Sequence, residues 1–368
     1  MNKKTLLSTL GIAVMFLTLL SLPAFAQYQR TDLVTNQGIT GTLKDSDLVN
    51  AWGLVSSATS PFWISDNATG LSTLYRITND PVLGISASKL GLIVTIPPAA
   101  DGGKGTPSGI VFNATNGFVF TDKTSGKSGK AAFIFATLDG TISAWNGAST
   151  TATITADRKD GASYTGLAIG TDNGQPFLFA ADDSANRRVD VFDANFNFVD
   201  WGPDAFSDPK IPNNFTPYGI QTITAADGTE TVWVTYTALN KAQSGFVDSF
   251  TTGGLLLSHF ALQGPLHSPW GVAQAPADFG PMSNAILVSN NTSRGRINAF
   301  DPHTGEFLGP LRDVSGQPIE IDQLWGIRFG NAVAVSNGGS NGLHNQLFFT
   351  AGSNSYLDGS FGVITVAP

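Results

Sequence analysis

Short runs of apolar residues recur along the chain, and each run is bounded by glycine, asparagine, aspartate or proline. The strongest runs are rich in Val, Ile, Phe, Tyr and Trp, and a polar turn and another run of the same kind follow each of them. These strongest runs cover residues 61–65, 131–136, 176–181, 231–236, 285–289 and 346–351. Runs of this length and composition predict β-strands, and the chain lacks long stretches with the 3.6-residue period of an amphipathic helix.

A five-residue tag precedes each of these runs. The tag has a polar residue, two variable residues of which the second is often aromatic, a glycine, and a β-branched residue or leucine. Its copies are NAWGL at 50–54, TPSGI at 106–110, SYTGL at 163–167, TPYGI at 216–220, SPWGV at 268–272 and QLWGI at 323–327. Successive tag glycines lie 52 to 57 residues apart. A spacing this regular indicates a repeat architecture of six units.

Each unit contains a short strand at the tag, two stronger strands and usually a fourth strand, as at 90–96 and 255–260. Six such units predict an all-β fold, a six-bladed β-propeller with four-stranded antiparallel blades. The last unit has only three strands, whereas an unassigned strand at 28–36 precedes the first tag. We therefore expect this N-terminal strand to close the last blade, which leaves no open edge between the two ends of the ring.

The first 26 residues have the pattern of a secretory signal peptide. Two lysines precede an apolar run from Leu6 to Leu22, and Ala-Phe-Ala follows at 24–26. We expect cleavage after Ala26, a secreted or periplasmic location, and one propeller domain over residues 27–368. The remaining chain has no apolar stretch long enough to span a bilayer, so stable membrane insertion is not expected.

Composition narrows the classes of partner. Only 13% of the residues are charged, and 25 of the 28 acidic residues are aspartates, which favour turns over helix interiors. The net charge is −8, and it becomes −10 once the two lysines of the signal peptide are removed. An acidic protein is repelled by nucleic acids and anionic membranes, so neither is an expected partner.

The chain offers few residues for catalysis or metal binding. It has no cysteine, which excludes disulfides, thiol catalysis and cysteine metal sites. Of the four histidines, His259, His267, His303 and His344, only His267 adjoins a tag, which argues against a multi-histidine zinc site. No cofactor is expected, although Asp- and Asn-rich turns leave Ca²⁺ or another divalent metal as an alternative. These turns lack the distal glutamate of a calcium loop, so local Asx-type hydrogen bonding is the favoured explanation for them.

Two sets of residues are candidates for ligand binding. The aromatic residues of the tags either pack as wedges between blades or surround the axial opening on one face. The turns after the strongest runs should lie on the same face and supply carboxylates and amides. The candidate ligand-binding residues are therefore Trp52, Tyr218, Trp270 and Trp325 in the tags, and Asp66, Asn67, Asp182 and Asn290 in the turns.

Several longer stretches resemble known propellers. Residues 177–193, FLFAADDSANRRVDVFD, are similar to an NHL-type repeat. Residues 47–55, 61–75, 133–146 and 268–280 resemble an uncharacterised family of exported bacterial propellers, whose members often carry a C-terminal sorting tail. The resemblance implies a six-bladed fold and export, and it implies no activity or catalytic residues. Gluconolactonase-type propellers are similar in outline, but the glutamate that they place at the first blade has no counterpart near Trp52.

Two classes of function follow. The first is an exported, non-catalytic binding or scaffold propeller that recognises a glycan, peptide or protein through the face that carries the tags. The second is a metal-assisted hydrolase or lyase, similar to a lactonase, that acts in the axial channel. The scarcity of histidines and the missing glutamate favour the first class. We therefore expect a binding or scaffold protein more than an enzyme.

Overall fold

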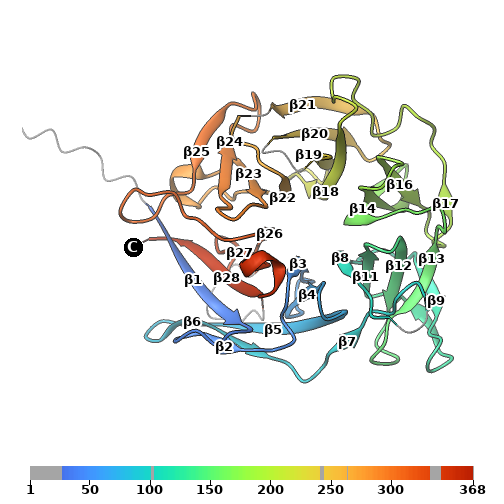
Figure 1. The fold of residues 1–368 in the computed structure, drawn as a ribbon, viewed down its shortest axis with the longest axis horizontal. Helices are drawn as coiled ribbons and strands as arrows, with labels where there is room; N and C mark the ends of the chain where they lie inside the picture. The colour runs from blue at the N-terminus through green and yellow to red at the C-terminus, as the bar shows by residue number, and fades with distance from the viewer. Residues whose placement is uncertain (1–26, 101–102, 241–243, 263, 332–340, 368) are drawn as a thin grey trace, which may run out of the picture.

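The computed structural model describes residues 27–100, 103–240, 244–262, 264–331 and 341–367, and the predicted signal peptide lies outside these residues. Six antiparallel β-sheets are arranged radially around a central axis (Figure 1). The predicted six-bladed, all-β propeller is therefore confirmed. Within the described residues, helical structure is limited to a 3₁₀ turn, η1 (Gly280–Met282), and a single turn, α1 (Ser353–Tyr356).

Each of the first three blades starts with its innermost strand. Blade 1 contains β3 (Ala51–Val55), β4 (Phe62–Asp66), β5 (Leu71–Asp80) and β6 (Gly84–Lys89), with β7 (Val94–Thr95) beside β5. Blade 2 contains β8 (Pro107–Phe112), β11 (Phe133–Thr137), β12 (Thr141–Trp145) and β13 (Thr153–Asp157). Blade 3 contains β14 (Tyr164–Asp172), β15 (Gln175–Asp182), β16 (Arg188–Phe192) and β17 (Phe198–Val199).

The last three blades repeat this order. Blade 4 contains β18 (Phe215–Thr224), β19 (Glu230–Ala238), β20 (Gly245–Thr251) and β21 (Leu256–Leu262). Blade 5 contains β22 (Pro269–Gln274), β23 (Ile286–Asn290), β24 (Ile297–Phe300) and β25 (Phe307–Pro310). Blade 6 contains β26 (Leu324–Phe329), β27 (Leu347–Ala351), β28 (Ser360–Val366) and β1 (Tyr28–Thr35), with β2 (Leu43–Lys44) parallel to β1.

The N-terminal strand closes the ring as predicted. β1 pairs antiparallel with β28, from Tyr28 opposite Val366 to Thr35 opposite Ser360, and the two strands lie side by side in Figure 1. The Tyr28 hydroxyl also reaches blade 5, where it donates to the Phe279 carbonyl at 2.8 Å. β1 therefore joins the last blade to both the end of the chain and the neighbouring blade.

Two details differ from the sequence prediction. The fourth strand of blade 1 is β6, whereas the more apolar segment 90–96 forms only the short β7. Side chains of β6 alternate between exposed and half-buried, as expected for an outer strand, while Val94 and Ile96 are buried against blade 2. In blade 2, an inserted hairpin of β9 (Val119–Thr121) and β10 (Ser128–Lys130) follows the innermost strand, and residues 125–127 lie in its exposed turn.

The six tag glycines form a closed series of contacts around the axis. Each glycine lies within an innermost strand and faces the backbone or side chains of the next blade's tag. A Cβ atom at Gly219 would lie 1.9 Å from the Trp270 carbonyl oxygen, and one at Gly109 would lie 2.2 Å from the Leu167 nitrogen. The series ends with Gly326, which faces Leu54 and the Trp52 carbonyl of blade 1. The glycine of the tag is therefore required for the close approach of neighbouring blades.

Hydroxyl groups on the second strands reinforce three of these joints. The Ser289 hydroxyl accepts from the Gly271 amide at 2.8 Å and donates to the Trp325 carbonyl of the next blade at 2.6 Å. Thr235 and Thr350 bridge their own tag glycine to the following tag in the same way. Each bridge satisfies two buried backbone groups with one side chain, which is required where water is excluded.

Candidate functional site

The tags bring four aromatic side chains together at the axis. Trp52, Tyr218, Trp270 and Trp325 pack as one cluster, which we call the aromatic plug. The rings of Trp52 and Trp325 are stacked with centroids 3.5 Å apart, and Trp270 meets both edge-on at about 6 Å. All four side chains are buried, with at most 6% of any residue exposed. The predicted convergence is confirmed, but little ring surface is left for a ligand.

Hydrogen bonds fix the plug across the ring. The Trp270 indole N–H donates to the Thr165 carbonyl at 3.0 Å, which links blade 5 to blade 3. The Trp325 N–H donates to the Asn50 side-chain oxygen at 3.1 Å. One bond joins blades 5 and 3, which are not neighbours, and the other joins blade 6 to the tag of blade 1. The plug therefore fills the axial end where the tags meet. Whether its rings also bind a ligand stays a prediction.

The turns after the second strands share a face with the tags, as predicted. The Asn67 amide N–H donates to the Asn50 carbonyl at 3.1 Å, and the Asn291 N–H donates to the Ser268 carbonyl at 2.9 Å. The Asp183 N–H makes the equivalent bond to Ser163 in blade 3. The first tag residue can turn back in this way because Asn50, Ser268 and Gln323 adopt left-handed backbone conformations, with φ between 49° and 51°.

The four polar candidates are buried and bonded to backbone. Asn67 donates to the Pro107 carbonyl at 3.1 Å, and Asn290 donates to the Pro265 carbonyl at 2.7 Å. Asp182 accepts from the amides of Ser163 and Ser184, both at 2.9 Å. These bonds tie the turns to neighbouring loops, so the structure assigns the side chains a structural role. Their role in ligand binding stays a prediction.

Asp66 is the most unusual of the four. Its side chain is fully buried, and one carboxylate oxygen accepts from the Thr73 amide at 3.0 Å. No described residue supplies a hydrogen bond to the other oxygen. Burial raises the pKa of the Asp66 carboxyl well above its usual range, and the nearby Asp45 carboxylate adds to the shift.

Asp66→Asn should therefore make stability less dependent on pH. Because the pKa is raised in the folded protein, the folded state holds a proton that the unfolded state releases, so the contribution of Asp66 to stability should fall as pH rises above about 4. The Asn variant keeps one donor and one acceptor at every pH and should lose less stability over the same range. Urea unfolding between pH 4 and 8 measures this, with the exposed Asp227→Asn as control. Equal slopes for the wild type and the Asp66 variant would contradict the assignment.

A strained turn lies against the plug. Asn354, Ser355 and Tyr356 in α1 all have left-handed backbone conformations, with φ of 55°, 56° and 68°. Such a conformation costs about 1–2 kcal/mol per residue for most L-amino acids. The turn is held by the Asn354 amide, which donates to Asp322 at 2.8 Å, and by the Tyr356 hydroxyl, which donates to Asn291 at 2.9 Å. Runs of strained backbone occur preferentially at functional sites.

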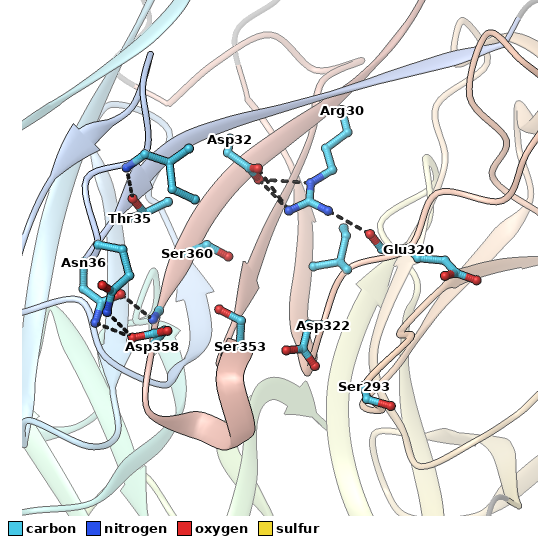
Figure 2. A pocket seen from close by; sticks show the side chains of 14 residues that line it. Arg30, Asp32, Thr35, Asn36, Ser293, Glu320, Asp322, Ser353, Asp358 and Ser360 are labelled. Atoms are coloured by element: carbon cyan, nitrogen blue, oxygen red, sulfur yellow. Dashed lines mark hydrogen bonds and ion pairs between the residues drawn. The ribbon is translucent and has the colours of Figure 1, made fainter.

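A polar pocket opens beside this turn, between blades 5 and 6 (Figure 2). Its volume is about 350 Å³, within the range of small-ligand sites. Side chains from β1, from the turns of blades 5 and 6 and from the segment before β26 line it. Its charged lining residues are Arg30, Asp32, Glu320, Asp322 and Asp358.

Two of the carboxylates in the pocket keep an oxygen for a ligand. Arg30 is paired with Asp32 at 2.9 Å and also donates to the Glu320 carbonyl. Asp322 uses one oxygen to accept from the Asn354 amide, and Asp358 uses one oxygen to accept from the side-chain amides of both Asn36 and Gln37. No group among the described residues donates a hydrogen bond to the second oxygen of Asp322 or of Asp358. The pocket is therefore suited to a polar ligand with hydrogen-bond donors or a positive charge.

Part of this pocket could have been predicted from the length of one turn. The turn of blade 6 runs from Gly352 to Gly359, twice the length of the turn between Asn67 and Gly70 in blade 1. A long turn in one copy of a repeat often carries function. The contribution of β1 to the pocket could not be predicted from the sequence near this turn, because Arg30 and Asp322 are almost 300 residues apart in the chain.

The axial channel has no set of three potential metal ligands among the described residues. The one such set that they contain, Asp208, Asp248 and His259, lies on the outer strands of blade 4 and its covering loop. The described part of the chain also has no helix that is long and apolar enough to cross a membrane.

Comparisons with known proteins identify relatives without known function. Two uncharacterized proteins of Acanthamoeba polyphaga mimivirus are 29% and 28% identical over 90% and 92% of this chain, and over 78% and 86% of their own lengths. No family model matches the chain. Among solved structures, a streptogramin B lyase is similar over 94% of this chain and 99% of its own, at 11% identity and a TM-score of 0.40.

Proposed function

We propose that this protein is a non-catalytic binding or scaffold propeller that recognises a peptide or protein segment carrying lysine or arginine. The proposal rests on the polar pocket between blades 5 and 6, where Asp322 and Asp358 each present a free carboxylate oxygen. Of the four acidic residues of the pocket, Asp32 is paired with Arg30 and Glu320 is paired with Arg294 and Arg296, so within the described residues Asp322 and Asp358 are the two without an arginine partner. A neutral glycan is the second ligand class that such a pocket accommodates.

The surroundings of the pocket support binding over catalysis. The Trp325 ring of the aromatic plug packs against Tyr356 of the strained turn, with centroids 5.8 Å apart, so the axial end beside the pocket is filled. The strained turn Ser353–Tyr356 forms one wall and is fixed by Asp322 and Asn291. A wall held in a single conformation lowers the entropy cost of binding.

We also propose that the protein is exported, and that it belongs with the exported bacterial propellers that its sequence resembles. This rests on the signal-peptide pattern of residues 1–26 and on the matching stretches, whereas the relatives identified here are viral. Export predicts a mature chain that starts at Gln27. Mass spectrometry of the exported protein tests this, and a product that keeps Met1 would contradict it.

The binding proposal predicts a charge-dependent loss in two matched variants. Asp322→Asn and Asp358→Asn each keep the oxygen that accepts the internal hydrogen bond and remove one negative charge. Each should weaken binding to an Arg- or Lys-containing peptide, selected on a peptide array, by about 10-fold, the effect of losing roughly 1.4 kcal/mol. Isothermal titration calorimetry measures the change.

Asp227→Asn is the control for this experiment. It removes the same charge from an exposed turn between β18 and β19, which lies at the opposite end of the strands from the tags. Its affinity should equal that of the wild type. If all three variants bind equally, or if a glycan array gives ligands and the peptide array gives none, the proposed ligand class is wrong.

A further inference from the structure

A second cluster of titratable side chains is buried between blades 3 and 4. Asp248 on β20 and His259 on β21 are directly opposite each other in the sheet, and Asp208 reaches them from the loop between β17 and β18. The His259 Nδ1 atom lies 2.7 Å from an Asp248 oxygen and 2.8 Å from an Asp208 oxygen. The Asp248 and Asp208 side chains are almost completely buried, and 13% of the His259 side chain is exposed.

Blade 1 contains a similar arrangement with a lysine in place of the histidine. There the Lys89 ammonium lies 2.7 Å from Asp45 and 2.6 Å from Asp47. An ammonium has three N–H groups and can donate to both carboxylates, whereas Nδ1 of an imidazole carries at most one. One carboxylate facing His259 is therefore left without a donor. Lys89 can therefore donate a hydrogen bond to both of its carboxylates, whereas His259 can donate to only one of the two that face it.

One carboxylate oxygen at the histidine cluster, the Asp208 oxygen that faces Nδ1, has no hydrogen-bond partner among the described residues. The Tyr236 hydroxyl, by contrast, is shared with the Asp248 carboxylate. The Asp208 side chain is only 1% exposed, so water does not reach this oxygen freely. Unpaired polar atoms at this degree of burial are costly, which points to a missing ligand.

We propose that Asp208, Asp248 and His259 bind a divalent transition-metal ion of the Zn²⁺ class. Imidazole nitrogen and carboxylate oxygen are ligands of such ions, and the ligand atoms of the three residues lie within 4.8 Å of one another. The ion takes the place of the Nδ1 proton and neutralises both carboxylates. A water molecule would complete the coordination.

The surroundings orient the proposed ligands. The second oxygen of Asp208 accepts from the Lys210 amide at 2.8 Å, so the first oxygen is turned toward His259. The imidazole ring packs against Phe246, with centroids 5.7 Å apart. Contacts of this kind hold ligating side chains in place. Because the ion would join the loop before β18 to the two outer strands of blade 4, its role would be structural.

The test uses purified protein without a histidine tag. The wild type should bind one Zn²⁺ per chain in calorimetry and melt at a higher temperature when Zn²⁺ is present. Asp248→Asn and His259→Gln should each weaken Zn²⁺ binding by more than about 100-fold, because loss of a ligand exceeds the 10–100-fold effect of losing an outer-shell contact. Bound Co²⁺ should show a visible spectrum in the wild type that both variants lose.

Two controls separate this site from surface binding. Asp47→Asn alters the lysine cluster of blade 1 and should leave Zn²⁺ affinity unchanged. His344→Gln removes a half-buried histidine that lies 2.9 Å from Asp278, and it should also have no effect. If the wild type binds no Zn²⁺, or if His344→Gln abolishes binding while His259→Gln does not, the proposal is overturned. The wild-type titration alone decides the case if a variant fails to fold.

Discussion

Deleting residues 28–36 should remove most of the stability of the folded ring. The deletion eliminates β1, including the buried side chains of Tyr28, Leu33 and Val34, each of which contributes about 1.5–3 kcal/mol through burial. It also exposes the edge of β28, whose backbone pairs with β1 over most of its length. The combined loss is comparable with the 5–15 kcal/mol that separates most folded proteins from their unfolded states.

Calorimetry and size-exclusion chromatography measure this loss. The truncated chain should melt far below the wild type, or associate through the exposed strand edge. Gln29→Ala is the matched control, because Gln29 lies in the same strand with its side chain in solvent. A truncated chain that remains monomeric and melts with the wild type would show that β1 is dispensable for closure.

Trp325→Ala should cost about 3–5 kcal/mol, as truncation of a core aromatic residue does. The side chain is 1% exposed, stacks on Trp52, and donates its indole N–H to Asn50. Its removal leaves a cavity at the axis and an unpaired amide oxygen. Urea unfolding followed by tryptophan fluorescence and circular dichroism measures the change in the free energy of unfolding.

The half-buried Trp201, on the outer side of blade 3, provides the comparison. It packs against Phe177 and Phe206 at the edge of the sheet, so Trp201→Ala should cost clearly less. The opposite outcome would be informative. If Trp325→Ala melts with the wild type but no longer binds the peptide selected by the wild type, the aromatic plug is a ligand surface and not a packing element.

The repeat made most of the fold predictable from the sequence. The spacing of the tags gave the number of blades, and the missing fourth strand of the last unit gave the closure by β1. The outer strand of blade 1 was assigned wrongly because apolar content was taken as the strand signal. An outer strand such as β6 is exposed on one side and alternates, whereas the apolar residues Val94 and Ile96 fill the space between two blades.

The site was less predictable, for a geometric reason. The tags predicted that Trp52, Tyr218, Trp270 and Trp325 converge, but not that they fill the axis, because that depends on how far each ring reaches across it. The polar pocket combines Arg30, Asp322 and Asp358, which come from separate parts of the chain. The unpaired oxygen at His259 depends on the number of N–H groups at one atom, which no sequence spacing encodes.

The series of contacts at the tag glycines makes each blade behave like a subunit in a cyclic assembly. Every joint is head-to-tail, with Gly219 facing blade 5 and Gly326 facing blade 1, so the last joint can form only if the other five have the correct angle. In an open solenoid, an enlarged joint would simply tilt the repeats beyond it. In this ring, a methyl group at any tag glycine would have to be accommodated by all six joints together, and the damage would appear far from the substitution.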